Sequence, residues 1–136
     1  MIMRLSVVLT LFVAALFVAT PAVEARETDY DELCNTLVPN MTKPIVLDFW
    51  ASWCGPCRTY APTFQTVERT YRYRADFYKV DVDDNSDLVQ AFEIQAVPTT
   101  IVIYNRDGDY LREEGVLSAY ELKSLIDRAC GKFSKR

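Results

Sequence analysis

The chain has no histidine, and only one pair of its cysteines, Cys54 and Cys57, has the Cys-x-x-Cys spacing. A structural zinc site needs four ligands, usually two such pairs or one pair with histidines, so zinc binding is not expected. Covalent haem attachment needs Cys-x-x-Cys-His, and Arg58 occupies the histidine position. The sequence therefore predicts no metal and no cofactor.

An excess of positive charge is also missing, because the formal net charge is −4. An acidic chain argues against nucleic acid or an anionic membrane as the main partner. The local exception is ERTYRYRADFY, residues 68–78, in which Arg69, Arg72 and Arg74 are interleaved with tyrosines. We expect this stretch to be the solvated end of a helix, where arginine stems cover aromatic edges, rather than a surface for stacked bases. Nucleic acid is therefore not an expected partner.

The N-terminus has a single positive charge, Arg4, before an uncharged and mostly apolar run over residues 5–20. As a helix this run would be about 24 Å long, which is short for a bilayer core of about 30 Å. The run is followed by small or modest side chains that end in Val23-Glu24-Ala25. This pattern predicts a signal peptide over residues 1–25 and one domain over residues 26–136. The protein is thus expected to be exported, to a periplasm or another extracytoplasmic space, and an uncleaved membrane anchor is the alternative.

The rest of the chain alternates between strand and helix signals, with no internal repeat and no linker. Continuous apolar runs predict buried strands, and apolar residues at helical spacing predict helices. Helices are expected over residues 29–37, 55–73, 85–92 and 118–130, and strands over residues 44–50, 76–82, 99–104 and 109–113. Asn85 or Ser86 is the expected N-cap of the third helix, and Ser118 with Glu121 is a predicted capping box in the last one. This order predicts an α/β fold with a central mixed β-sheet flanked by helices on both faces.

The cysteine pair lies where this predicted fold favours chemistry. Cys54 follows a buried strand and precedes a helix, and unpaired N–H groups at a helix N-terminus stabilise a thiolate and lower its pKa. Cys57 comes one helical turn later on the same face. A purely structural disulfide is the alternative, but it would close almost no loop and so stabilise little through chain entropy. Redox chemistry is the favoured interpretation.

The segment DFWASWCGPCRTYAP, residues 48–62, resembles the active-site segment of the thioredoxin family. Its Gly55-Pro56 dipeptide is typical of thioredoxins, whereas strong periplasmic oxidants have Pro-His and protein disulfide isomerases have Gly-His. The resemblance continues through KVDVDDN (79–85), AVPTT (96–100), NRDGD (105–109) and EGVLS (114–118). It covers essentially the whole predicted domain and implies the thioredoxin fold.

The resemblance also implies roles for individual residues. Cys54 is expected to be the attacking thiolate, and Cys57 is expected to resolve the mixed disulfide with the substrate. Pro98 matches the family's cis-proline, beside which the backbone binds an extended substrate. The residues expected to contact the substrate around the sulfur atoms are Trp53, Gly55, Pro56, Val97, Pro98, Gly115 and Val116. Trp50 and Pro62 are expected to be structural, as a core aromatic and a helix kink.

Asp48 stands out because it is a carboxylate inside the apolar run PIVLDFW. Burial without a fixed cation would raise its pKa and make it a candidate proton acceptor for the Cys57 thiol. It matches the family's buried aspartate, and Lys79 matches the lysine that lies near it. The alternative is a strand-end residue that faces solvent.

Together these features predict a thiol–disulfide oxidoreductase, most simply a monomeric reductase of disulfides in exported proteins. Outside the cytosol it would need electrons from a membrane thiol donor. A dedicated cytochrome-maturation reductase is less expected because there is no room for the insert that such proteins carry. A disulfide oxidant or isomerase, or a redox-inert binding module with the same fold, are the alternatives.

Cys34 and Cys130 form a second, widely separated pair. A disulfide between them would in theory stabilise the fold by about 4–5 kcal/mol. The family topology argues against it, because the first and last helices lie on opposite faces of the sheet, whereas a disulfide needs Cα atoms within about 7 Å. We therefore expect two small buried residues with free thiols.

Overall fold

The computed structural model describes residues 24–133, so the predicted signal peptide lies outside the described part except for Glu24 and Ala25. In chain order the elements are β1 (Arg26–Glu27), α1 (Tyr30–Glu32), the π-helix η1 (Leu33–Leu37), β2 (Ile45–Trp50), α2 (Gly55–Tyr71), β3 (Asp76–Asp81), α3 (Ser86–Ala91), β4 (Thr99–Ile103), β5 (Tyr110–Glu114) and α4 (Ala119–Phe133). No helix within residues 24–133 is long and apolar enough to cross a membrane. The predicted order of elements is confirmed, with β1 as an addition.

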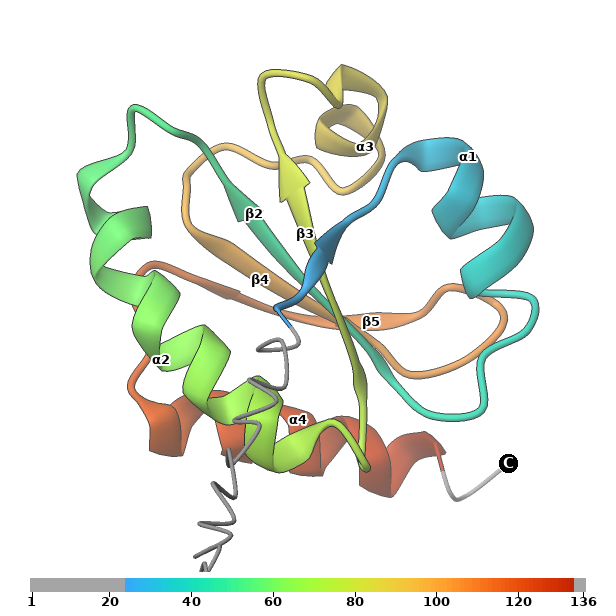
Figure 1. Cartoon of the computed structure of the whole chain (residues 1–136). Coiled ribbons are helices and arrows are strands. Elements are labelled where there is room, and N and C mark those ends of the chain that lie inside the picture. Colours follow the sequence, from blue (N-terminus) through green and yellow to red (C-terminus); the bar gives the residue numbers. More distant parts are fainter. Residues whose placement is uncertain (1–23, 134–136) are drawn as a thin grey trace, which may run out of the picture.

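The five strands form one mixed sheet in the order β1-β3-β2-β4-β5 (Figure 1). Strand β3 runs parallel to β2, whereas β4 runs antiparallel to it and pairs in turn with β5. Strand β2 is therefore hydrogen-bonded on both edges, and its first five residues are buried. The continuous apolar run of this segment is the sequence pattern of such a central strand.

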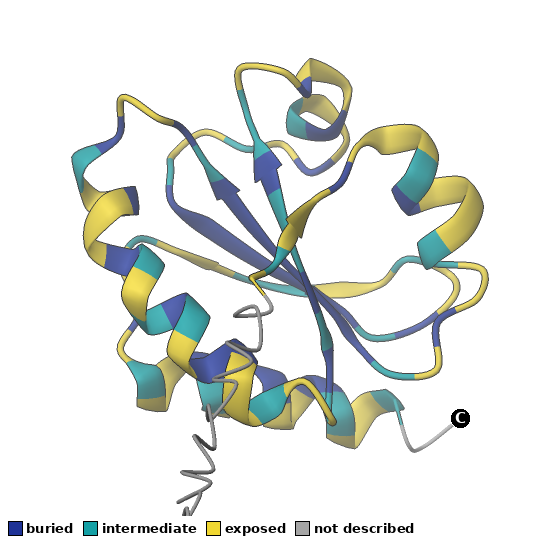
Figure 2. Cartoon of the chain, in the orientation of Figure 1, coloured by how far each residue is buried: buried dark blue, intermediate teal, exposed yellow. Residues whose placement is uncertain are grey.

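Helices cover both faces of the sheet, as predicted. Helices α2 and α4 lie together on one face, and α1, η1 and α3 lie on the other (Figure 1). Each face has its own core, with Tyr60, Phe64 and Leu122 in the first and Leu33, Phe49 and Leu88 in the second. The buried residues follow the central strands and the inner sides of the helices (Figure 2). The sheet is thus a rigid layer between two apolar cores.

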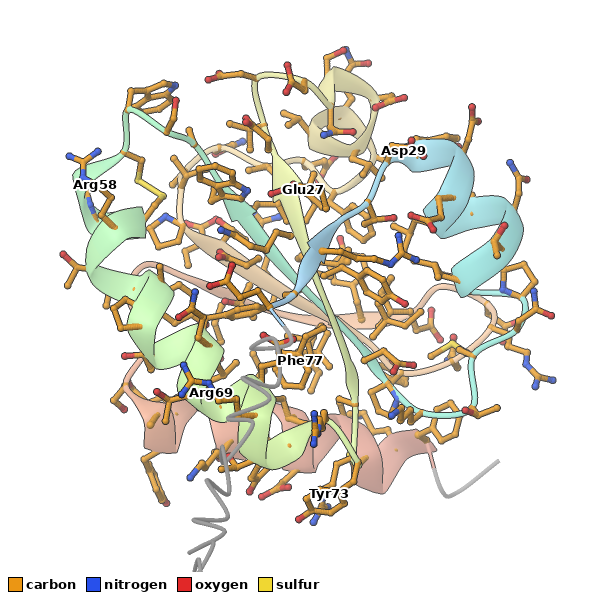
Figure 3. The ribbon with its side chains drawn as sticks, viewed as in Figure 1. Glu27, Asp29, Arg58, Arg69, Tyr73 and Phe77 are labelled. Carbon is orange, nitrogen blue, oxygen red and sulfur yellow. A yellow bond between two sulfur atoms is a disulfide. The ribbon has the colours of Figure 1, made fainter. Side chains whose placement is uncertain are left out.

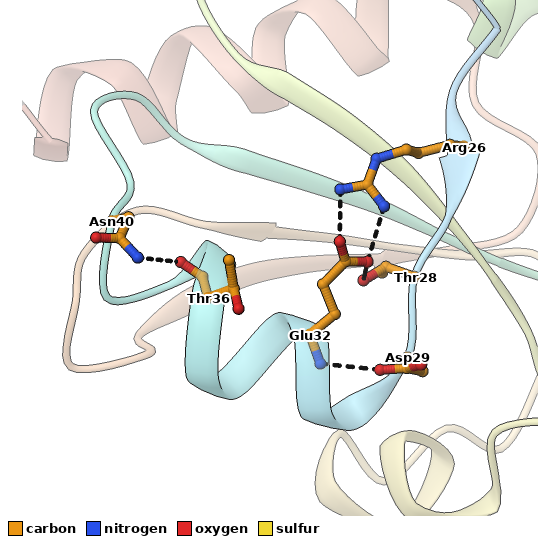
Figure 4. Close-up of polar contacts among 6 residues, drawn as sticks. All are labelled: Arg26, Thr28, Asp29, Glu32, Thr36 and Asn40. Carbon is orange, nitrogen blue, oxygen red and sulfur yellow. Dashed lines mark hydrogen bonds and ion pairs between the residues drawn. The ribbon is translucent and has the colours of Figure 1, made fainter.

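The first helix differs from the prediction of one helix over residues 29–37. It begins as α1, where the Asp29 carboxylate caps the chain by accepting a hydrogen bond of 2.8 Å from the Glu32 N–H. It then widens into η1 instead of continuing as an α-helix. Arg26 on β1 donates two hydrogen bonds to the Glu32 carboxylate, and Thr28 donates a third (Figure 4). These contacts fix the start of the helix against the edge of the sheet.

The two remaining cysteines have free thiols, as expected, but the prediction that both are buried is wrong. Cys34 is exposed, because among the residues of η1 only Leu33 is buried in the core. Cys130 is half-buried, with its sulfur 3.5 Å from the Arg74 carbonyl oxygen. Helical spacing predicted the helices but did not distinguish the inner from the outer face for a residue as small as cysteine.

The two predicted caps had different outcomes. Asn85 is the N-cap residue of α3, but its side chain donates to the Asp81 carbonyl instead of accepting from a helix N–H. The capping box of α4 is confirmed: Ser118 Oγ accepts from the Glu121 N–H at 3.2 Å, and the Glu121 carboxylate accepts from the Ser118 N–H at 2.7 Å. This reciprocal pair fixes where α4 begins.

Removal of this cap should destabilise the fold. We expect Ser118→Ala to lower the free energy of unfolding by about 1 kcal/mol, because the Glu121 N–H loses its acceptor. Ser124→Ala, an exposed substitution within the same helix, is the matched control and should be neutral or slightly stabilising. Urea unfolding followed by circular dichroism measures both. Equal stabilities of the two variants would contradict the role of the cap.

Candidate active site

Cys54 lies at the junction between the central strand and the long helix of the first core. Strand β2 ends at Trp50, and Cys54 is the N-cap residue of α2. Its extended backbone (φ −87°, ψ 110°) turns the chain into the helix, and Pro56 in the first turn has no N–H that would need a partner. The Cys54 sulfur accepts a hydrogen bond of 3.1 Å from the Cys57 N–H. The helix N-terminus therefore stabilises negative charge on this sulfur.

Cys54 and Cys57 form a disulfide with a Cα–Cα distance of 5.3 Å, seen near Arg58 in Figure 3. Both cysteines are almost fully buried, with 4% and 5% of their surface exposed. The surrounding apolar contacts come from Ala51, Trp50 and Val97. The pair is thus a disulfide packed in a small apolar cluster, with little of either cysteine exposed.

The loop before β4 forms one wall beside the sulfur atoms. The Val97–Pro98 peptide bond is cis, as the resemblance implied for Pro98. The Val97 carbonyl oxygen lies 3.6 Å from the Cys54 sulfur. The Gly115 N–H donates to the Pro98 carbonyl at 2.8 Å and so ties the loop after β5 to this wall. Gly115 has φ +90°, a conformation that favours glycine.

An apolar groove begins at Trp53 and runs toward α3. It has a volume of about 240 Å³ and is lined by Trp53, Val82, Val89, Ile94, Gln95, Ala96 and Val97. Trp53 is 66% exposed, and its indole N–H donates to the Asp83 carboxylate at 2.9 Å, which holds the ring across the groove. Val116, 45% exposed, adds apolar surface to the loop after Gly115. The predicted contact residues are thus divided between the helix start, the cis-proline loop and the loop after β5.

Asp48 is buried in the middle of β2, so the alternative of a solvent-facing residue is wrong. Only 2% of its surface is exposed, and its Oδ1 atom has no hydrogen-bond partner within residues 24–133. It lines a cavity of about 30 Å³ together with Lys79, Ala61 and Phe64. Ala61 lies one turn after Cys57 on the same face of α2, so this cavity lies below the cysteine pair.

Burial raises the pKa of Asp48 to about 7. Loss of hydration is the main cause, the positive charge of Lys79 opposes it, and the negative charge of Glu27 adds to it. The Lys79 ammonium also lies 4.1 Å from the centre of the Trp50 ring, so one cation contacts both the carboxylate cavity and the aromatic side chain. Asp48 therefore changes protonation state near neutral pH, as a proton acceptor and donor must.

Trp50 is less deeply buried than a core aromatic, which corrects the sequence expectation. It is half-buried, and its indole N–H donates to the Glu27 carboxylate at 2.9 Å. No sequence pattern predicts this contact, because β1 has only two residues and so short a strand shows no periodicity. Asp83 was missed as the partner of Trp53 for a related reason, since no local pattern predicts a contact between residues thirty positions apart. The hydrogen bond that the Arg58 guanidinium donates to the Ser52 carbonyl oxygen was likewise not predicted.

The raised pKa of Asp48 makes the stability of the protein depend on pH. Above pH 3.8 the unfolded chain loses the Asp48 proton, whereas the folded state keeps it up to about pH 7. The stabilisation that comes from this retained proton is therefore fully present below pH 3.8 and is lost as the pH rises through about 7. The free energy of unfolding should fall over this window by up to about 4 kcal/mol. Asp48→Asn should remove most of this fall and be more stable than the wild type at pH 8.

Urea unfolding of the oxidised protein at pH 5 and pH 8 measures this difference. Asp31→Asn, at an exposed carboxylate in the first helix, is the control and should follow the wild type at both pH values. If Asp48→Asn and the wild type lose stability in parallel between pH 5 and pH 8, the ionisation of Asp48 is not the cause.

Comparisons with known proteins agree with this geometry. The family model described as "Thioredoxin" matches residues 23–128. Thioredoxin C-3 of Corynebacterium nephridii is 34% identical over 94 residues, which are 69% of this chain and 63% of that protein. Thioredoxin of Borreliella burgdorferi is 41% identical over 61 residues, which are 45% of this chain and 52% of that protein, so the matches span less than two thirds of either relative.

Among solved structures, the crystal structure of thioredoxin from Malassezia sympodialis superimposes with a TM-score of 0.68 and 31% identity, covering 79% of this chain and 91% of that one. The disulfide at the start of α2 and the cis-proline beside it are the features that the sequence resemblance implied. The family model covers most of the described chain. This chain therefore belongs to the thioredoxin family.

Proposed function

We propose that this protein reduces disulfides in exported proteins. The observation that carries the proposal is the position of Cys54, whose sulfur accepts from the Cys57 N–H at the start of α2 and lies beside the cis-Pro98 loop. The helix N-terminus favours the Cys54 thiolate once the pair is reduced. The Gly55-Pro56 dipeptide, typical of thioredoxins, supports the reducing direction.

In the first step the Cys54 thiolate attacks one sulfur of the substrate disulfide. The bond between the two substrate sulfurs breaks, the leaving sulfur departs as a thiolate that takes up a proton, and a mixed disulfide joins the substrate to Cys54. The groove from Trp53 to Val97 binds apolar side chains next to the substrate cysteine. The Val97–Pro98 segment offers its backbone to an extended substrate strand.

In the second step Cys57 releases the substrate. Asp48 takes the proton of the Cys57 thiol, which is consistent with a pKa of about 7, and the resulting thiolate attacks the Cys54 sulfur. The mixed disulfide breaks, the second substrate sulfur leaves as a thiolate and is protonated, and the Cys54–Cys57 disulfide forms. Two electrons thus pass from the protein to the substrate disulfide; one of the two protons that the substrate thiolates take up comes from Cys57 through Asp48, and the other comes from solvent.

The location of this activity rests on the N-terminal sequence. The uncharged run over residues 5–20 supports export, by a signal peptide over residues 1–25 or by an uncleaved anchor. Outside the cytosol the oxidised pair would be reduced again by a membrane thiol donor, and the protein would act as a monomer. An oxidant is the second candidate, because an oxidising compartment would keep the pair as a disulfide.

Substitution of the resolving cysteine should trap substrates. Cys57→Ser leaves the Cys54 nucleophile but removes the thiol that breaks the mixed disulfide, so covalent complexes with exported proteins should accumulate. Cys54→Ser is the matched control and should trap nothing. Both variants carry Cys34→Ala and Cys130→Ala, so that no free thiol competes. Non-reducing gels and mass spectrometry identify the complexes; trapped proteins confined to the cytosol, or none, would contradict the proposal.

A further inference from the structure

Three charged residues lie in one row across the sheet. Glu27 on β1, labelled in Figure 3, is in register with Lys79 on β3, and Lys79 is in register with Asp48 on β2. Side chains in register on neighbouring strands point to the same face, and neighbouring strands lie about 4.8 Å apart. Lys79 is therefore flanked by two carboxylate residues, whose strands lie about 10 Å apart. Asp48 and Lys79 were expected in the site, whereas Glu27 was not.

The Glu27 carboxylate is held by two hydrogen bonds. Its Oε1 atom accepts from the Trp50 indole N–H at 2.9 Å, and its Oε2 atom accepts from the Asp81 backbone N–H at 3.2 Å. Because the second donor belongs to the backbone of β3, the carboxylate is tied to the sheet as well as to a side chain. Glu27 is exposed, yet it fixes the edge of the Trp50 ring that carries the nitrogen.

The Trp50 ring connects this carboxylate to the active site. The ring packs against the cluster formed by Ala51, Cys54 and Cys57. The Lys79 ammonium lies 4.1 Å from the centre of the same ring, which is the distance of a cation–π contact. Trp50 therefore contacts both the cluster that contains the cysteine pair and the Lys79 cation, and Glu27 holds it in that place.

Lys79 does not pair directly with either carboxylate. It forms no ion pair within residues 24–133, and the Asp48 Oδ1 atom has no hydrogen-bond partner in that part of the chain. An ammonium that turned toward a buried carboxylate would gain a strong, charge-assisted hydrogen bond. The face of the Trp50 ring is a competing site for the cation. The position of the ring thus decides how closely Lys79 approaches Asp48.

The charged and titratable groups that face Asp48 come from β1, β3, α2 and the residues before β1: Glu27, Lys79, Cys57, Tyr60 and Glu24. Tyr60 shares a hydrogen bond of 2.9 Å with Thr100 on β4, and burial raises the pKa of Tyr60, so it is neutral wherever Asp48 titrates. Glu24 lines the same cavity and accepts a hydrogen bond of 3.0 Å from Gln65. Lys79 and Glu27 are the two groups whose charges act on the pKa of Asp48, and they act in opposite directions.

We propose that Glu27 is a positioning residue for the second step of the exchange. By fixing the Trp50 ring, Glu27 keeps Lys79 on that ring and out of a direct ion pair with Asp48, so that Asp48 remains a proton acceptor for the Cys57 thiol. A direct ion pair would stabilise the ionised carboxylate and make it a weaker base. The inference rests on the proposed function, in which the proton passes from Cys57 to Asp48; Glu27 itself neither gives nor takes a proton.

Two substitutions separate the charge of Glu27 from its contact with Trp50. Glu27→Gln keeps an oxygen acceptor for the indole N–H but removes an exposed charge about 10 Å away, which should lower the pKa of Asp48 by about 0.3 unit. Glu27→Ala also releases the ring, so that Lys79 can pair with Asp48 and lower this pKa by about 1 unit. Both shifts are downward, because both changes favour the ionised carboxylate.

Two measurements follow Asp48 in the full chain. Carbon-13 NMR of its carboxyl group gives the pKa in the oxidised protein, with Asp48→Asn to identify the signal. Stopped-flow reaction of the reduced protein with equimolar 5,5′-dithiobis(2-nitrobenzoate) follows the resolving step: attack by Cys54 releases one thionitrobenzoate and forms a mixed disulfide, and attack by Cys57 releases the other. Cys34→Ala and Cys130→Ala leave only this pair reactive. The second release should speed up as the pH rises through the pKa of Asp48, and at lower pH in Glu27→Ala.

Asp84→Asn is the matched control. Asp84 is exposed and lines the same hollow as Glu27, but the Trp50 N–H donates to Glu27. We expect both midpoints to move by about 1 unit in Glu27→Ala, by about 0.3 unit in Glu27→Gln and by less in Asp84→Asn. Equal shifts in the two Glu27 variants would mean that only charge acts, and equal shifts in Glu27→Ala and Asp84→Asn would mean that any nearby charge does. Either result, or a loss of stability without a shift, would overturn the proposal.

Failure of this inference and failure of the proposed function give different results. Insulin reduction by the unmodified chain, with no shift of the Asp48 pKa in either Glu27 variant, overturns the positioning role alone. If Glu27→Ala shifts the pKa in the NMR titration but Asp48→Asn does not slow the second release, the hold of Glu27 on Lys79 is supported. That result would contradict Asp48 as the proton acceptor, which belongs to the proposed function.

Discussion

The burial of β2 on both faces and both edges is the constraint on which the active site depends. Because β3 and β4 hydrogen-bond to it and two cores enclose it, the direction in which β2 ends is fixed. That end places Cys54 at the N-terminus of α2, where the Cys57 N–H donates to its sulfur. The cis-Pro98 loop reaches the same point because β4 lies beside β2. Because the core is rigid, Cys54 and the cis-Pro98 loop are held in fixed positions relative to each other.

Strand β2 also holds Asp48, the carboxylate that is proposed to exchange a proton with Cys57. Asp48 lies where the packing of β2 would favour an apolar residue, and the loss of hydration raises its pKa to about 7. A carboxylate that is half-protonated near neutral pH suits the exchange of a proton with a cysteine thiol, but it weakens the fold in its ionised form. Lys79 moderates this penalty without removing it. Function and stability therefore oppose each other at one residue of the central strand.

Much of the fold could be predicted from the sequence, because long segments with one clear period decide it. The apolar run of β2 and the helical spacing of α2 predicted the bounds of these two elements within a few residues. The CGPC segment, with its family resemblance, predicted the position of the active site. The predictions failed for very short elements and for contacts that depend on how distant segments pack together. Strand β1 is too short to show a period, η1 departs from the α-helix without a local signal, and the exposure of Cys34 depends on how the helix rotates against the sheet. The contacts of Trp50 with Glu27 and of Trp53 with Asp83 join distant segments, so they appear only once the chain has folded.

The reduction potential of the Cys54–Cys57 pair tests the central claim most directly, because the reducing direction rests on the Gly55-Pro56 dipeptide between the two cysteines. Equilibration of the protein in thiol buffers, in a chain with Cys34 and Cys130 replaced by alanine, gives this potential without interference from the free thiols. We expect a value near about −270 mV, the potential of a thioredoxin-type reductant. A value near about −120 mV would make the pair a disulfide oxidant and would contradict the account.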